Sequence, residues 1–154
     1  MKMKTSLLCL LASLLVISCS KDKFTTVPQV KMKSISPGTV RQGDVIAIKA
    51  KFTDQEGDVD SVFVIYKWYN GSVGFQPLDT LKISLNGLGV PVKTKEADIV
   101  VEFAYGADLL PTYLTLPLSP VTRDTTATFG FVLKDKAGNR SEYTQSDAIR
   151  LLKR

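Results

Sequence analysis

The stretch "VIAIKAKFTDQEGDVDSVFVIYKWY", residues 45–69, decides the fold class. In its first eight residues every second side chain is apolar, at Ile46, Ile48, Ala50 and Phe52, while Lys49 and Lys51 fall on the opposite face. A period of two is typical of a β-strand that buries one face. Its last nine residues, 61–69, are apolar on both faces, which predicts a central strand. A short acidic segment separates the two apolar runs, so the stretch predicts two strands joined by a turn.

The same alternation recurs along the chain. We expect further strands at residues 98–105, 113–118, 126–135 and 147–153, a first strand near Val30 and Met32, and a short one near Leu81 and Ile83. Pro117 restricts its run to an edge or a strand end, because proline cannot donate to a ladder. Turn signals separate these runs, at Pro37-Gly38, Gln42-Gly43, Asn70-Gly71, Asn86-Gly87 and Gly138-Asn139. Seven or eight short strands in one domain predict an all-β sandwich.

The N-terminal segment predicts a signal peptide. Lys2 and Lys4 precede an apolar run, residues 6–18, which as a helix would span about 20 Å of the roughly 30 Å that a membrane core requires. The run ends in Val16-Ile17-Ser18-Cys19, which resembles a bacterial lipobox. The resemblance implies that the chain is cut before Cys19, that the Cys19 sulfur carries a diacylglycerol, and that the new amino group is acylated, as with palmitate. We expect a signal peptide at 1–18, a lipidated cysteine and tether at 19–29, and one domain at 30–154.

The predicted anchor sets the expected location. Two or more acyl chains hold a protein stably on a membrane without spanning it. Ser20 is not the aspartate that retains enterobacterial lipoproteins in the inner membrane, which favours the outer membrane. Lys21-Asp22 partly resembles the charged export tag of surface lipoproteins in the Bacteroidota. We therefore expect a lipid-anchored protein of the cell envelope, on either the periplasmic face or the cell surface.

Composition argues against catalysis and nucleic-acid binding. The net charge of +5 includes Lys2 and Lys4, so the mature chain is nearer +3, and its basic residues form no run. Of the two cysteines, Cys9 leaves with the signal peptide and Cys19 is consumed by lipid, so no disulfide and no cysteine chemistry remain. The chain has no histidine, the commonest general base and zinc ligand. Motifs for serine hydrolases, phosphate loops and dinucleotide binding are also absent. We expect a protein that is not an enzyme.

The acidic turn is the strongest candidate for a ligand site. In "FTDQEGDVDS", residues 52–61, carboxylates fall at every second position, at Asp54, Glu56, Asp58 and Asp60. Charges this close repel one another unless solvent or a cation compensates. Calcium takes six to eight oxygen ligands, and Gly57 would let the loop wrap around it, although the EF-hand spacing is not met. The alternative is a solvated acidic turn between two strands.

A second turn strengthens the prediction. Together with "FTDQEGDVDS", the stretch "LKDKAGNRSEY", residues 133–143, resembles bacterial immunoglobulin-like modules of the PKD, cadherin-like and fibronectin type III kinds. The resemblance implies an immunoglobulin-like β-sandwich, in which the B–C and F–G loops lie at the same end. Asp135 and Asn139 would then approach the first carboxylates and complete the calcium candidates. Lys136 departs from such a site, and Asn139 has an alternative role as a left-handed turn residue beside Gly138.

The aromatic residues of the central run have two interpretations. Trp68 resembles the buried tryptophan of the third strand in immunoglobulin-like folds, which implies core packing. Alternatively Tyr66, Trp68 and Tyr69 form a surface on which sugars stack, but alternation places Tyr69 on the opposite face from the other two.

Three functions fit these features. The leading hypothesis is a lipid-anchored binding or adaptor module that contacts another envelope protein. The first alternative is a glycan-binding accessory lipoprotein of a polysaccharide-uptake system, which burial of Tyr66 and Trp68 would disfavour. The second alternative is a structural component of a secretion or motility apparatus. The sequence does not separate the leading hypothesis from the last one.

Overall fold

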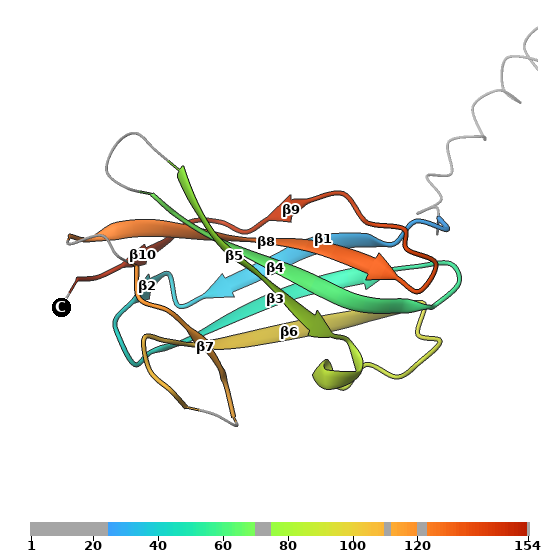
Figure 1. Cartoon of the computed structure of the whole chain (residues 1–154), viewed down its shortest axis with the longest axis horizontal. Coiled ribbons are helices and arrows are strands. Elements are labelled where there is room, and N and C mark those ends of the chain that lie inside the picture. The colour runs from blue at the N-terminus through green and yellow to red at the C-terminus, as the bar shows by residue number, and fades with distance from the viewer. Residues whose placement is uncertain (1–24, 70–74, 110–111, 120–122, 154) are drawn as a thin grey trace, which may run out of the picture.

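The computed structural model describes residues 25–69, 75–109, 112–119 and 123–153, which form two β-sheets packed face to face (Figure 1). The four-stranded sheet has the order β1 (Gln29–Ser36), β3 (Val45–Thr53), β6 (Glu96–Tyr105) and β7 (Leu114–Leu116). The six-stranded sheet has the order β2 (Thr39–Val40), β10 (Ile149–Leu151), β8 (Thr125–Asp135), β4 (Val59–Tyr69) and β5 (Phe75–Ser84), with β9 (Thr144–Gln145) paired to β8. A single turn of 3₁₀ helix, η2 (Asn86–Leu88), follows β5.

Apolar residues at every second position of the sequence form the inner faces of the sheets. In β3, Ile46, Ile48, Ala50 and Phe52 are at most 1% exposed, as the pattern predicts. They lie opposite the inward residues of β6, with Ile46 paired to Phe103 and Ile48 to Val101. The same register brings polar residues together on the outer face, where Lys51 lies opposite Asp98.

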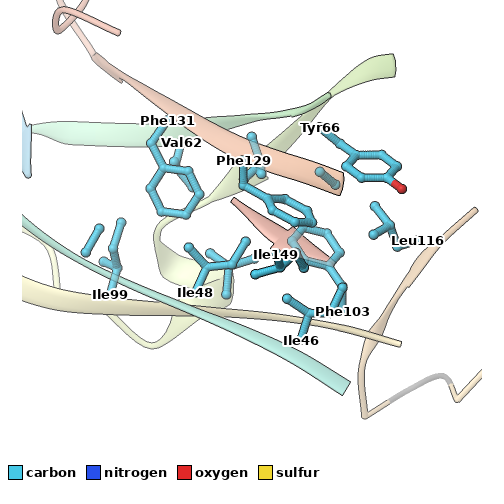
Figure 2. Close-up of a cluster of buried hydrophobic side chains, with 14 of the residues drawn as sticks. Ile46, Ile48, Val62, Tyr66, Ile99, Phe103, Leu116, Phe129, Phe131 and Ile149 are labelled. Carbon is cyan, nitrogen blue, oxygen red and sulfur yellow. The ribbon is translucent and has the colours of Figure 1, made fainter. Parts of the chain in front are cut away.

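Aromatic side chains fill the space between the sheets. Figure 2 shows Phe103 from β6 and Phe129 from β8 meeting there, and their ring centroids are 5.9 Å apart. Tyr66 also stacks on Phe129, and their ring centroids are 5.1 Å apart. Burying each such ring contributes about 1.5–3 kcal/mol to folding, which accounts for stability without a disulfide.

The order of the strands is that of an immunoglobulin-like sandwich. β4 lies between β8 and β5, which confirms the prediction of a central strand. β2 leaves the sheet of β1 and pairs in parallel with β10 at the edge of the other sheet. The described residues contain ten strands rather than the expected seven or eight. The additional strands include β2 and β9, each of two residues, which main-chain pairing creates without an apolar period.

Two local predictions require correction, and others lie outside the described residues. Leu118 does not share the inward face of Leu116, because β7 ends before Pro117 and leaves Leu118 41% exposed. β5 extends well before the short strand expected near Leu81 and Ile83. The signal peptide, Cys19 and the Asn70-Gly71 turn fall outside the described residues. Within the described ranges, no helix has the length and hydrophobicity needed to cross a bilayer.

Candidate cation site

The acidic turn between β3 and β4 is held by main-chain contacts at one end of the sandwich. The Asp54 amide donates to the Lys95 carbonyl at 2.8 Å, and the Lys136 amide donates to the Asp58 carbonyl at 3.2 Å. The second contact joins this turn to the one that follows β8, so the two motif-bearing turns lie at the same end, as the resemblance implied (Figure 1).

Gly57 allows the turn to close. Its φ is +69°, a conformation that side chains disfavour, and a Cβ there would lie 2.8 Å from the carbonyl carbon and oxygen of Lys93. The loop thus rests directly on the main chain of the segment before β6.

Three carboxylates meet in the turn. One oxygen from each of Asp54, Glu56 and Asp58 lies within 4.8 Å of the others. Calcium binds oxygen at about 2.3–2.6 Å, so ligands on opposite sides of the ion are about 4.6–5.2 Å apart. The three oxygens therefore fit around one calcium ion, with room for further oxygen ligands from solvent.

The burial of Asp54 is independent evidence for a cation in this cluster. The residue is fully buried, and its Oδ2 accepts the Asp58 amide at 2.9 Å. Its Oδ1 is also buried and has no hydrogen-bond partner among the described residues. A buried polar atom without a partner typically costs about 1–3 kcal/mol, and more when it is charged. A cation within the cluster would remove that cost.

The electrostatics of Asp58 indicate the same need for positive charge. Burial, followed by the negative charges of Asp135, Asp54 and Glu56, raises the pKa of the Asp58 carboxyl above its ordinary value. Each of these negative charges makes ionisation of Asp58 less favourable. A bound divalent ion would reverse the effect by stabilising the carboxylate.

The remaining sequence candidates lie outside the three-carboxylate cluster. Asp135 is buried, but its two oxygens accept the Asn139 amide and the Asn139 Nδ2, both at 2.7 Å. Asp135 and Asn139 therefore close their own turn, although the charge of Asp135 reaches Asp58. Asp60 is exposed beyond the cluster, and its carbonyl accepts the Leu85 amide. The exposed Lys136 forms no ion pair with a described residue.

Sequence reasoning missed the residues that position the turn. The Gln55 amide donates to the carbonyl of Thr25 at 3.2 Å, which brings the start of the described chain against the acidic turn. Lys93 and Lys95 contribute main-chain atoms. Any residue type can supply an amide or a carbonyl, so side-chain identity gave no signal for these contacts. Only Gly57 was a recognisable sign of a close main-chain approach.

The aromatic residues of β4 belong mainly to the core. Trp68 is 7% exposed and Tyr66 is 3% exposed, with ring centroids 5.7 Å apart. Burial and the neighbouring Tyr105 raise the pKa of the Tyr66 hydroxyl. Tyr69 lies on the opposite face of the strand, as alternation predicted. The buried positions of Tyr66 and Trp68 weigh against the sugar-stacking surface considered from the sequence.

The fold and the site define an immunoglobulin-like β-sandwich with a cluster of carboxylates at one end. No protein-family model matches the chain, and no curated protein matches it either. Among solved structures, similarity extends to the sporulation control protein Spo0M from Bacillus subtilis, with 10% identity and a TM-score of 0.48, covering 84% of this chain and 51% of that one.

Two further structures show similarity at the same level. A DUF4466 family protein from Parabacteroides merdae has 14% identity and a TM-score of 0.47, covering 80% of this chain and 44% of that one. A Niemann-Pick type C2 protein from the Japanese carpenter ant has 12% identity and a TM-score of 0.43, covering 83% of this chain and 93% of that one. The chain therefore spans about half the length of the first two proteins.

Proposed function

We propose that the protein is a lipid-anchored binding or adaptor module of the cell envelope, and that a divalent cation, most suitably calcium, orders the end of the domain nearest its tether. The lipobox supports the anchor. The filled core supports contact through the surface, because aromatic rings occupy the space between the sheets where an internal ligand would otherwise bind (Figure 2).

The cation proposal rests on the buried Oδ1 of Asp54, which has no hydrogen-bond partner in the part of the chain that the structure describes. A solvated acidic turn, which is the alternative, would leave its carboxylates in contact with water. Here the Asp54 carboxylate is fully removed from solvent. One oxygen from each of Glu56 and Asp58 lies within 4.8 Å of an Asp54 oxygen, a separation that fits shared coordination of one cation. The Gln55–Thr25 hydrogen bond links the same turn to the beginning of the domain. A bound cation would thus stiffen the junction between tether and sandwich.

Thermal unfolding of residues 20–154 tests the cation. At a calcium concentration about one hundred times the dissociation constant, binding to the folded state alone adds about 2.7 kcal/mol. For a domain of this size the melting temperature should rise by several degrees. Magnesium should do less, since it requires a tighter octahedral arrangement of ligands.

Two matched variants make the test specific. Asp58→Asn should fold without calcium and lose most of the calcium-dependent rise in melting temperature. Asp60→Asn removes the same charge from the exposed position outside the cluster and should keep that rise. If millimolar calcium leaves the wild-type melting curve where a chelator leaves it, the turn is a solvated acidic turn and the cation proposal fails.

A further inference from the structure

The outer face of the six-stranded sheet carries an apolar stripe. Cross-strand pairing places Phe63 of β4 beside Val132 of β8, and Ile65 beside Gly130, on the side away from the core. Phe63, Ile65 and Val132 are only partly buried. The ring of Tyr143, which is 40% exposed, covers Gly130, where a Cβ would lie 2.0 Å from the ring. Glycine at this position lets the tyrosine ring lie directly on the sheet.

Cations cover the aromatic rings of this stripe. The Lys67 Nζ lies 4.1 Å from the centroid of the Tyr143 ring, and the Arg140 guanidinium lies 5.1 Å from that of Phe63. Lys82 of β5 is paired with Phe63 from the other side and is exposed. The stripe therefore combines apolar surface with positive charge held at defined positions.

Three cations of this face lack an acidic partner among the described residues. Lys134 lies directly opposite Arg140 in an isolated β-bridge, and like charges at such positions destabilise a sheet. Within the part of the chain that is described, Lys82, Lys134 and Arg140 have no carboxylate at ion-pair distance. Residues 63–67 of β4 and 130–134 of β8 include no carboxylate, and the exposed Asp60 lies at the start of β4.

The other sheet has lysines that form ion pairs with acids. On its outer face Lys33 pairs with Asp98 at 2.6 Å, and Lys51 pairs with Glu96. Lys31 also lies directly opposite Lys51 on that face, but Lys51 is paired with Glu96. Neither Lys134 nor Arg140 has a carboxylate at ion-pair distance among the described residues. A face that retains uncompensated charge over apolar surface is suited to a partner that supplies the opposite charge.

We propose that this face, defined by Phe63, Ile65, Val132, Tyr143, Lys134 and Arg140, binds an acidic segment of a partner protein. Carboxylates of the partner would pair with Lys134, Arg140 and Lys82, and its apolar side chains would cover the stripe. Aromatic residues and arginine dominate the binding energy of protein interfaces. A sugar would stack on open ring faces, whereas here cations already occupy the faces of Phe63 and Tyr143.

This inference rests on the proposed role as a binding module and is independent of the lipid and of calcium. The test uses the mature protein in detergent and a defined probe, a random copolymer of glutamate and tyrosine, with polyglutamate and polygalacturonate for comparison. The copolymer should bind most tightly, because it offers both carboxylates and apolar rings. Binding should weaken as salt is raised, since exposed charges are screened.

Two variants with equal net charge locate the site. The triple variant Lys82→Gln, Lys134→Gln, Arg140→Gln should weaken copolymer binding at least tenfold. The control Lys31→Gln, Lys33→Gln, Lys49→Gln, on the opposite sheet, should change it less than twofold. Melting curves verify that both variants fold. Removing the Lys134–Arg140 repulsion should leave the first variant at least as stable as the wild type.

Three outcomes overturn the proposal. Equal loss in the two variants would mean that binding follows net charge alone. Polygalacturonate that binds as tightly as the copolymer would indicate an acidic glycan instead of a protein. A wild-type protein that binds none of the probes would show that this face is not a binding surface. Loss of lipid labelling or of the calcium effect, with copolymer binding retained, would instead contradict only the anchor or the cation.

Discussion

At the scale of single residues, Gly57 shows how one position controls the candidate site. Its positive φ and its contact with the Lys93 main chain both exclude a side chain. Gly57→Ala should lower the free energy of unfolding by roughly 1–3 kcal/mol, the usual cost of local main-chain strain. Gly87→Ala is the control, because a Cβ at Gly87 meets nothing within 4 Å. Chemical denaturation of both variants measures the difference, and equal stabilities would contradict the role of Gly57.

Asp58 gives the site a pH dependence. Its pKa in the folded protein is raised above the ordinary value of 3.8, so the folded state holds this proton more tightly than the unfolded state does. Without calcium, stability should therefore fall as the pH rises through the folded-state pKa, and the loss is complete above it. Asp58→Asn removes this loss and should be more stable than the wild type at pH 7 in chelator.

The comparison across pH and calcium separates this explanation from others. The advantage of Asp58→Asn should shrink as the pH falls, and it should vanish well below 3.8, where Asp58 is protonated in both folded and unfolded states. With saturating calcium at pH 7 the order should reverse, because only the wild type gains the full set of ligands. Melting temperatures at several pH values measure both trends. An advantage that is constant across pH would rule out a raised pKa as its cause.

The site residues could be predicted only in part, for a physical reason. Charge and spacing identified Asp54, Glu56 and Asp58, since repulsion among neighbouring acids follows from the sequence itself. The same spacing included Asp60, which lies outside the cluster because the chain has already entered β4 there. From the sequence, Asp135 was a plausible ligand. In the structure, Asn139 donates hydrogen bonds to both carboxylate oxygens of Asp135. The spacing of acidic residues does not indicate which hydrogen-bond partners folding brings to them.

At the scale of elements, long alternating runs were predictable and short strands were not. β3 and β6 alternate over eight residues or more, so burial of one face fixes their type and their inward residues. β2 and β9 have two residues each and exist only because a neighbouring main chain is within reach. The parallel pairing of β7 with β6 likewise depends on where the intervening chain returns.

Serine side chains complete the hydrogen bonding at the edge of β8. The Ser141 Oγ accepts the Leu133 amide at 2.9 Å, in a place where strand pairing is interrupted. Ser141 is 7% exposed, so Ser141→Ala would leave a buried amide without a partner, at a cost of about 1–3 kcal/mol. Ser34→Ala, at an exposed position of β1, should stay within about 0.5 kcal/mol of the wild type. If urea unfolding gives the two variants equal stability, water already satisfies the Leu133 amide.

At the scale of the whole molecule, the described domain has surfaces of different chemical character. One end gathers carboxylates beside the start of the described chain, and one sheet face pairs two of its lysines with acids. The other sheet face carries cations over apolar surface. Only the first of these was foreseeable, because the outer faces acquire their character through cross-strand register. Lys134 and Arg140 are six residues apart in sequence, and only the isolated β-bridge between them makes them opposite neighbours.

The proposed anchor would determine which of these surfaces can meet a partner, and it depends on Cys19. If the lipobox is processed as proposed, acyl chains on Cys19 hold the mature protein at a membrane, since two or more chains give stable attachment. Cys19→Ser removes the only sulfur that can accept the lipid, so incorporation of an alkyne-labelled palmitate should be lost and the protein should remain uncleaved or leave the membrane fraction. Cys9→Ser is the matched control, because Cys9 lies within the predicted signal peptide and should leave labelling intact. In-gel fluorescence of the labelled protein, with membrane fractionation, measures both results. Labelling that persists in Cys19→Ser would mean that another residue carries the lipid, and labelling absent from the wild type would leave an ordinary secreted domain whose binding face acts free of any membrane.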